Sequence, residues 1–315
     1  MQKQKLDWKI QLLDRLLSLL KPVHKMSLDE LRKLDETSIS PIAERVLVGR
    51  SIPLPEVAKQ TVSGRHGEIP IQIYYPSTES NLALILFFHG GGCIYGNLQT
   101  HDRMCRRIAR DTGAIVLAVR YHLAPFAKYP IPLEDCYDVV TWAVENATKL
   151  RADRQKIIVM GDSAGGNLAT AVCLMSRDRN HPFIAQQVLL YPVTSGILDQ
   201  PSVDRNANAP VLTKDAMQTY IDCYAQDESD RLKPYFSPLL AEDLSNLPPA
   251  LIVTCEVDLL HDQAVGYARR LQEAGNQVLL LDYPGMVHGF MSFLPFCRAA
   301  RPAFEQVAVF VRSVV

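Results

Sequence analysis

Hydrophobic positions along the chain follow two alternating patterns. Short apolar runs, typical of strands buried on both faces, alternate with longer stretches in which apolar residues return every three or four positions. The runs predict strands at 71–75, 83–88, 114–119, 157–160, 188–191, 250–254 and 278–281. The longer stretches predict helices at 103–111, 133–148, 168–176, 264–273 and 303–314. This alternation predicts an α/β fold, with a mostly parallel central sheet and helices on both of its faces.

The chain before residue 60 does not belong to this alternation. Apolar residues at helical spacing predict a helix over 6–20, which Pro22 ends. Ser27 and Glu30 then form the pattern of a capping box that opens another helix. An amphipathic helix of this kind can lie on a membrane, but a cover over a groove of its own protein is the favoured interpretation.

A second irregular stretch lies between residues 192 and 238. It contains one helical piece, at 214–224, and is too long for an ordinary connection between a strand and a helix. We expect this insertion to lie over the carboxyl ends of the strands, where sheets of this class bind ligands.

Composition narrows the class of protein. The 315 residues are 48% hydrophobic, enough for one large core in a single domain. The net charge of −1 gives no support for nucleic acid or for an anionic membrane as a partner. No run of 18 apolar residues exists, and Asp14 and Arg15 interrupt the only stretch similar to a signal peptide. The seven cysteines lack paired spacing, which favours reduced thiols in a cytoplasm over disulfides or zinc.

A serine between glycines directly follows one of the predicted strands. Ser163 lies in Gly161-Asp162-Ser163-Ala164-Gly165-Gly166, and a helical pattern comes next. A sharp strand-to-helix turn exposes the serine hydroxyl, and Gly161 and Gly165 remove β-carbons that would clash there. A plain Gly/Ser-rich turn is the alternative. A serine becomes a useful nucleophile only beside a base, which itself needs an orienting acid.

Three histidines follow Ser163 in the chain, and one of them is well placed to be this base. His288 lies just past the last predicted strand, so it shares the sheet edge at which Ser163 emerges. His181 follows a helix and is expected at the opposite edge, and His261 lies at a helix start. The alternative for His288 is a loop histidine bonded to backbone.

The acid is expected after the penultimate strand. Asp258 and Glu256 both follow the 250–254 strand, and Asp258, which lies further out, is preferred. Asp262 is the third choice, and its alternative role is to cap the helix that begins there.

Three consecutive glycines follow another buried strand. His89-Gly90-Gly91-Gly92 offers backbone amides with no side chains to block the approach of a substrate. Such amides stabilise the negative charge of a tetrahedral intermediate, and the amide of Ala164 is expected to complete this oxyanion hole. A flexible turn is the alternative. His89 is expected to bond the loop rather than act as a base.

From about residue 60 to residue 315, these segments resemble the hormone-sensitive-lipase-like esterases of the α/β-hydrolase fold. The matching segments are His89-Gly90-Gly91-Gly92, Tyr121-His122-Leu123-Ala124-Pro125, Leu133-Glu134-Asp135, Gly161-Asp162-Ser163-Ala164-Gly165-Gly166, Glu256-Val257-Asp258 and His288-Gly289-Phe290. The bacterial acetyl esterases look most similar, because of Gly96-Asn97-Leu98, Thr100-His101-Asp102 and Tyr283-Pro284-Gly285.

The resemblance implies a role for each candidate residue. The family pattern makes Ser163 the nucleophile, His288 the base and Asp258 the acid. The expected oxyanion donors are Gly91, Gly92 and Ala164, with support from His89, Gly90, Gly161, Asp162 and Gly165. The reaction implied is hydrolysis of short- to medium-chain acyl esters through an acyl-enzyme, with no metal and no cofactor.

The resemblance also implies an organisation. One α/β-hydrolase domain over 1–315 would have its core at about 60–191 and 239–315, and a cap built from about 1–55 and 192–238. An amidase or deacetylase with the same triad stays open as an alternative, and a non-catalytic receptor for a small ligand is less favoured. Family members include monomers and dimers, so a homodimer also stays open.

Two departures from the family pattern concern the site. Cys93 stands where an aromatic residue usually follows the glycines, so it is expected to widen the acyl side of the pocket and to make activity sensitive to thiol reagents; a small buried residue is the alternative. Val257-Asp258-Leu259 lacks the usual proline after the acid, which predicts a differently set acid loop.

Overall fold

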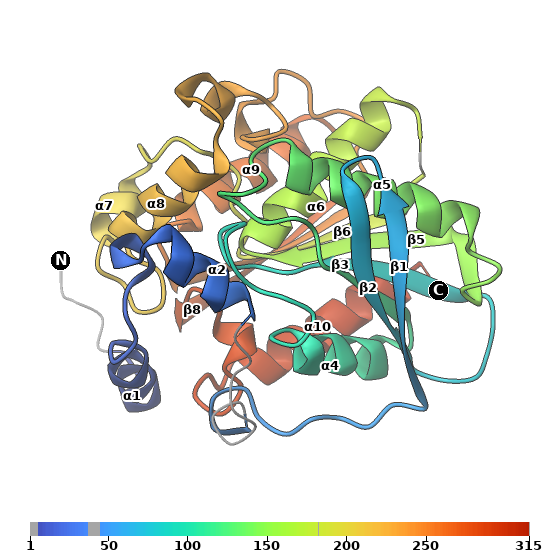
Figure 1. The fold of residues 1–315 in the computed structure, drawn as a ribbon, viewed down its shortest axis with the longest axis horizontal. Helices are drawn as coiled ribbons and strands as arrows, with labels where there is room; N and C mark the ends of the chain where they lie inside the picture. The colour runs from blue at the N-terminus through green and yellow to red at the C-terminus, as the bar shows by residue number, and fades with distance from the viewer. Residues whose placement is uncertain (1–5, 37–44, 182, 315) are drawn as a thin grey trace.

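The computed structural model describes residues 6–36, 45–181 and 183–314, and these form an eight-stranded sheet between two layers of helices (Figure 1). The strands are β1 (Glu56–Gly64), β2 (Gly67–Tyr75), β3 (Leu82–Phe88), β4 (Ile115–Val119), β5 (Ala152–Asp162), β6 (Gln186–Leu190), β7 (Ala250–Val257) and β8 (Val278–Val287). Their order across the sheet is β1-β2-β4-β3-β5-β6-β7-β8. β2 runs antiparallel to both of its neighbours, and the other pairs are parallel. The predicted mostly parallel α/β sheet is confirmed.

Helices cover both faces of the sheet, as the alternating pattern predicted (Figure 1). One layer consists of α5 (Ile131–Glu145), α6 (Ala164–Asp178) and α9 (His261–Glu273), and the other of α4 (Asp102–Thr112) and α10 (Ala300–Arg312). Every residue of α6 from Ala164 to Ser176 is buried. Because it is buried all round, α6 makes contacts on every side, which hold it in place.

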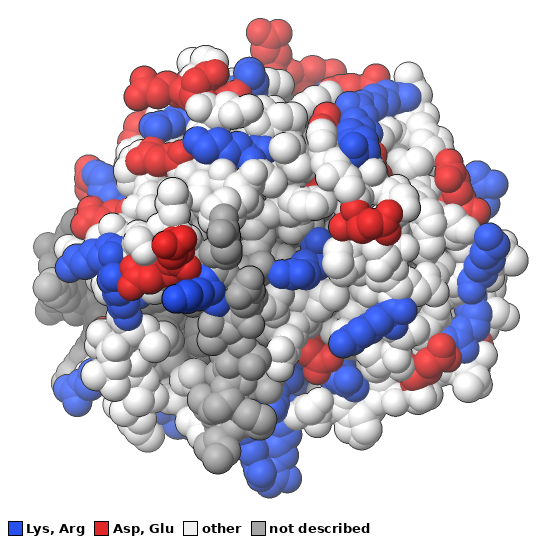
Figure 2. Space-filling model, viewed as in Figure 1, with Lys and Arg blue, Asp and Glu red and all other residues white. Residues whose placement is uncertain are grey.

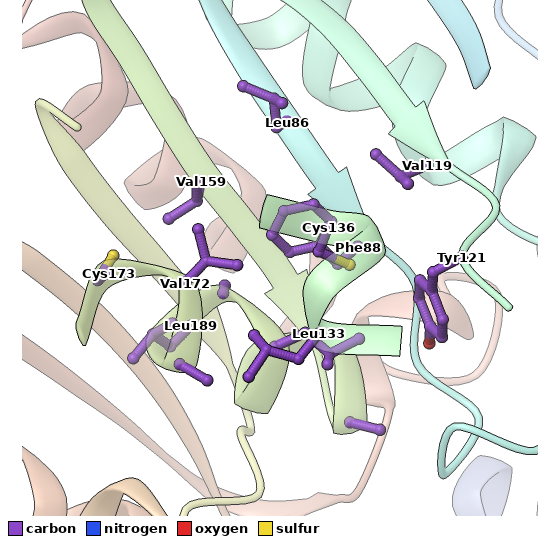
Figure 3. Packing of buried hydrophobic residues seen from close by; sticks show 14 of the residues in the cluster. Leu86, Phe88, Val119, Tyr121, Leu133, Cys136, Val159, Val172, Cys173 and Leu189 are labelled. Carbon is purple, nitrogen blue, oxygen red and sulfur yellow. The ribbon is translucent and has the colours of Figure 1, made fainter. Parts of the chain in front are cut away.

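The core side chains between α5, α6 and the sheet hold the central strands in place. Figure 3 shows Phe88, Val159 and Leu189, from three neighbouring strands, pointing toward Leu133 of α5 and Val172 of α6. All five are fully buried, and burying each such side chain contributes roughly 1.5–3 kcal/mol to folding. The carboxyl ends of β3 and β5, which the glycine loop and Ser163 follow, are therefore held firmly in place.

The sequence pattern missed β1 and shortened β5 and β8. β1 has the sequence Glu-Val-Ala-Lys-Gln-Thr-Val-Ser-Gly, and only Val62 in it is fully buried. The strand prediction relied on apolar runs, which mark strands buried on both faces. β1 is a mostly exposed edge strand without such a run, so it was missed. β8 runs on to Val287, which brings His288 directly to the end of the strand.

The chain before residue 60 and the insertion form helical pieces beside the sheet. The first holds α1 (Trp8–Leu17), the 3₁₀ turn η1 (Val23–Lys25) and α2 (Leu28–Glu36); the second holds α7 (Pro201–Arg205), α8 (Lys214–Tyr224), η2 (Glu228–Leu232) and η3 (Pro238–Leu240). The capping box of α2 is confirmed, since the Ser27 amide donates to Glu30 Oε2 at 2.7 Å and the Glu30 amide to Ser27 Oγ at 3.3 Å. η1 packs against α8, so the two segments meet. In the part of the chain described, none of the helices has the length and apolarity to cross a membrane.

Candidate active site

Ser163 occupies a strained turn between β5 and α6. Its backbone has φ 55° and ψ −118°, a conformation that L-residues rarely adopt and that turns the chain sharply from strand into helix. The Ser163 amide donates to the carbonyl of Leu190 at 2.8 Å, which fixes the turn to β6. A β-carbon at Gly165 would lie 1.9 Å from the carbonyl oxygen of Phe88, so only glycine lets α6 approach β3 this closely.

The Ser163 hydroxyl begins a chain of contacts that runs through a histidine to a carboxylate. His288 Nε2 lies 2.9 Å from Ser163 Oγ, and His288 Nδ1 lies 2.7 Å from Asp258 Oδ2. Asp258 is 1% exposed, and its other oxygen accepts from the Leu260 amide at 2.9 Å. A carboxylate at Nδ1 keeps the proton on that nitrogen, which leaves Nε2 free to accept the serine proton.

The competing candidates have other partners. Glu256 accepts a hydrogen bond from the Gly285 amide at 2.8 Å, and Asp262 accepts one from the Ser202 amide at 2.8 Å. His261 Nδ1 lies 2.7 Å from Asp262 Oδ1, and the carbonyl of His181 accepts from Tyr137. The structure therefore brings Ser163, Asp258 and His288 together and gives the other four candidates different partners.

The glycine loop after β3 lies beside the serine turn because of the register of the sheet. Phe88 of β3 pairs with Gly161 of β5, so the residues that follow each strand emerge as neighbours. The Gly90 amide donates to Asp162 Oδ1 at 2.9 Å, and the Tyr121 hydroxyl donates to the His89 carbonyl at 2.6 Å. These bonds anchor the loop at both of its first two residues.

The amides that follow in this loop remain available to a substrate. Gly91 and Gly92 have φ of +112° and +64°, and a β-carbon at Gly92 would lie 2.4 Å from the ring of Tyr220. Among the described residues, the amides of Gly91, Gly92 and Ala164 donate to no protein acceptor. The first two follow the anchored part of the loop, and the third belongs to the residue after Ser163.

Two buried side chains, His89 and Asp162, and the partly buried His101 form a group that supports the loop. His101 Nε2 lies 3.4 Å from the Asp162 carboxylate, and the rings of His89 and His101 are 5.5 Å apart. Burial opposes the charge on Asp162, but His101 and the Gly90 amide stabilise it more, so the pKa of Asp162 lies below its ordinary value. Burial and then His101 lower the pKa of His89 to about 3, so His89 is neutral at pH 7. His89 bonds the loop, as predicted, through Nδ1 to the Gly90 carbonyl at 2.8 Å.

A small apolar cavity of about 30 Å³ adjoins Ala164 and Gly92. Four of the lining side chains come from one face of helix α8, where each lies three or four positions from another. The lining residues are Gly92, Cys93, Ala164, Asn167, Val193, Met217, Tyr220, Ile221, Tyr224 and Phe236. Cys93 is 2% exposed, and burial raises the pKa of its thiol to about 12.

A larger hollow of about 620 Å³ lies between α4 and α10, and its lining includes none of Ser163, Asp258 and His288.

Sequence reasoning missed the structural partners His101, Tyr121 and Tyr220. The first two lie in segments that resemble the family, but the sequence did not indicate what either side chain does. Tyr220 is one aromatic residue in a helical pattern, and nothing local indicates that its ring packs on Gly92. Among the residues that the structure describes, no group of three His, Cys, Asp or Glu side chains could hold a metal ion.

A family match, similar sequences and a solved structure all assign the chain to the same family. Residues 85–292 match a family of the alpha/beta hydrolase fold. The chain is 38% identical over 275 residues to an ethyl acetate hydrolase of Pseudomonas putida, which covers 86% of this chain and 85% of that protein. It is 40% identical over 241 residues to the carboxylesterase NlhH of Mycobacterium tuberculosis, covering 75% of each.

A solved structure extends this likeness to the whole chain. The hyperthermophilic esterase of the archaeon Pyrobaculum calidifontis superposes with a TM-score of 0.91 at 36% identity, covering 99% of this chain and 100% of the other. The family match spans more than half of the sequence, and the identities exceed 30% over most of it. The chain therefore belongs to the hormone-sensitive-lipase-like esterase family of the α/β-hydrolase fold, a family of carboxylesterase-type hydrolases.

Proposed function

We propose that this protein hydrolyses carboxylic esters of short- to medium-chain acids through an acyl-enzyme, with Ser163 as nucleophile, His288 as base and Asp258 as acid. The observation that carries the proposal is the unbroken line of contacts from Ser163 Oγ to His288 Nε2 at 2.9 Å, and from His288 Nδ1 to Asp258 at 2.7 Å. The family to which the chain belongs supports the same reaction.

The reaction begins when Ser163 Oγ attacks the acyl carbonyl and its proton passes to His288 Nε2. Asp258 stabilises the imidazolium cation that forms. The carbonyl oxygen becomes negative and accepts hydrogen bonds from the amides of Gly91, Gly92 and Ala164; loss of one such donor costs about 2.7–4 kcal/mol of transition-state stabilisation. His288 then gives the proton to the leaving alcohol. Water repeats the cycle on the acyl-enzyme and releases the acid.

We also propose that residues 1–55 and 192–238 form a cap over a core of residues 60–191 and 239–315. The contact of η1 with α8 supports this organisation, because it joins the two segments. The α8 side chains Met217, Tyr220, Ile221 and Tyr224 cover the cavity next to Ala164. The cap thus sets the room for the acyl group, and about 30 Å³ favours the short end of the range.

The free cysteines support a proposed cytoplasmic location, and an open strand edge supports a proposed homodimer. All seven cysteines are free and six are buried, which supports a cytoplasmic enzyme. β8 lies at the edge of the sheet, with one side of its backbone unpaired by another strand of the sheet. This edge is the surface through which we propose a homodimer, and light scattering of the purified protein tests it.

The experiment that tests the function is a series of chromogenic esters with acyl groups from two to twelve carbons, hydrolysed by wild type and by Ser163→Ala. We expect serine-dependent turnover that peaks at short chains. Anilides of the same acids test the amide alternative in parallel. Equal rates for wild type and purified Ser163→Ala would overturn the mechanism, and serine-dependent turnover of anilides alone would replace the ester with an amide.

A further inference from the structure

Helix α1 carries two apolar surfaces, and only one of them faces the protein. Ile10 and Leu13 are fully buried against the core. Other large apolar side chains of the same segment, spaced so that they share the outer face of the helix and the turn after it, are exposed to solvent. The exposed set is Trp8, Leu12, Leu16, Leu19 and Leu20.

This outer surface is the densest group of exposed large apolar side chains in the described chain. Five of the fourteen such residues fall within thirteen positions, and Trp8 is 66% and Leu19 82% exposed. Scattered exposed apolar residues need no explanation, but a contiguous patch marks an interaction site. Exposure of Trp8 and Leu19 in water is unfavourable unless another surface covers them.

The charge around this patch indicates what covers it. Residues 6–25 contain four Lys or Arg against two Asp, a local charge of +2 in a chain whose net charge is −1. Lys9 lies over the ring of Trp8, with Nζ 5.8 Å from the centroid. Asp7 is paired with Arg298, and Lys21 with Glu30. Figure 2 shows uncharged surface where α1 lies in Figure 1, with Lys or Arg side chains next to it and Asp or Glu side chains further toward α2.

We propose that this outer face of α1, from Trp8 to Leu20, binds peripherally to an anionic phospholipid bilayer. Apolar side chains enter the boundary between headgroups and acyl chains, and Lys9, Arg15 and Lys25 lie at the level of the phosphates. A tryptophan beside a lysine suits this boundary, because its ring is apolar at one end and polar at the other. A free phosphate or nucleotide could pair with the Lys and Arg side chains, but it would leave the exposed apolar side chains uncovered.

Binding here would bring the cap next to the bilayer. η1 follows α1 directly and packs against α8, whose side chains line the cavity beside Ala164. Esters dissolved in the membrane would then be presented close to the cap. The inference itself does not rest on the proposed reaction, since binding is measured without substrate.

The test is sedimentation of the full chain with phosphatidylcholine vesicles that contain 30% phosphatidylglycerol or none. We expect wild type to sediment with the anionic vesicles and to be released by high salt, because exposed charges are screened. The apolar variant Trp8→Ser/Leu12→Gln/Leu19→Gln and the charge variant Lys9→Gln/Arg15→Gln should each lose affinity by roughly tenfold or more. Tryptophan emission of wild type should shift to shorter wavelength on binding.

The matched control is Leu232→Gln, since Leu232 and Leu20 are both 64% exposed but Leu232 lies on η2. This variant should bind as wild type does. Circular dichroism and thermal melting establish that each variant folds. Wild type that fails to sediment with anionic vesicles overturns the proposal, as does equal binding by the apolar variant. A dimer of wild type that the apolar variant dissolves, without vesicle binding, would assign the face to a second copy of the chain.

Discussion

His288 Nε2 lies 2.9 Å from Ser163 Oγ, although 125 positions separate the two residues in the chain. Both residues follow strands of the same parallel run, Ser163 after β5 and His288 after β8, so both emerge at one edge of the sheet. Asp258 follows β7, next to β8. Three strand ends therefore bring these three side chains into contact, and the spacing of the strands sets the distances.

The first prediction concerns which carboxylate serves His288. Asp258→Asn should lower kcat by roughly 10⁴-fold. An amide group in place of the carboxylate no longer keeps the proton of the His288 imidazole on Nδ1, so Nε2 is less often free to accept the serine proton. Glu256→Gln is the matched control, since Glu256 contacts the Gly285 amide instead. We expect it to retain most activity. Steady-state kinetics on a short ester measure both, and the reverse order of effects would assign the acid to Glu256.

The second prediction concerns the acyl cavity. Tyr220 packs its ring on Gly92 and lines the cavity beside the glycine loop. Tyr220→Ala should raise the ratio of activity on an eight-carbon ester to activity on a two-carbon ester by at least tenfold, since each added methylene in such a pocket is worth about 1–3 kcal/mol. Gln218→Ala, on the same helix but outside the lining, should leave the ratio unchanged. An unchanged ratio in Tyr220→Ala would mean that the acyl chain lies elsewhere.

The third prediction reverses an expectation from the sequence. Cys93 looked able to make activity sensitive to thiol reagents, but its thiol is buried and its pKa is raised to about 12, so almost no thiolate exists at pH 8. We expect iodoacetamide to leave activity intact while it labels the half-buried Cys223, with both sites followed by mass spectrometry. Inactivation that tracks alkylation of Cys93 would restore the earlier expectation.

The fourth prediction is a dependence of stability on pH. The pKa of His89 is about 3 in the folded protein and about 6.5 when unperturbed. Between these values the unfolded chain binds one proton more, so the free energy of unfolding falls as the pH drops from 6.5 toward 3. Above 6.5 both states are neutral, and this contribution is constant. The slope from His89 is about 1.4 kcal/mol per pH unit within that window.

His89→Asn removes this titration, so its unfolding free energy should vary less steeply with pH than that of wild type. Urea denaturation at pH 7, 6 and 5 measures the slopes. His181→Asn replaces an exposed histidine and serves as the control, with a slope equal to wild type. Parallel slopes in all three proteins would mean that folding does not lower the pKa of His89.

The candidate residues were easier to identify from the sequence than the strands and helices that surround them. Ser163 and the glycine loop each sit at the end of an apolar run, and local turn chemistry is enough to recognise them. Strand β1 was missed because its residues are mostly exposed and carry no apolar run. Helix α6 begins at Ala164, earlier than its apolar pattern suggested, because two glycines hide the helical signal at its start.

The amino-acid sequence was enough to predict the α/β alternation, the serine turn, the glycine loop and two short lists of candidates for the base and the acid. These depend on side-chain periodicity and on turn residues, which act over a few positions. Only the folded structure shows that Asp258 rather than Glu256 contacts His288, that His101 contacts Asp162, and that Tyr220 lines a cavity of about 30 Å³. Such contacts join segments far apart in the chain, and they depend on strand register and helix packing, which no local pattern specifies.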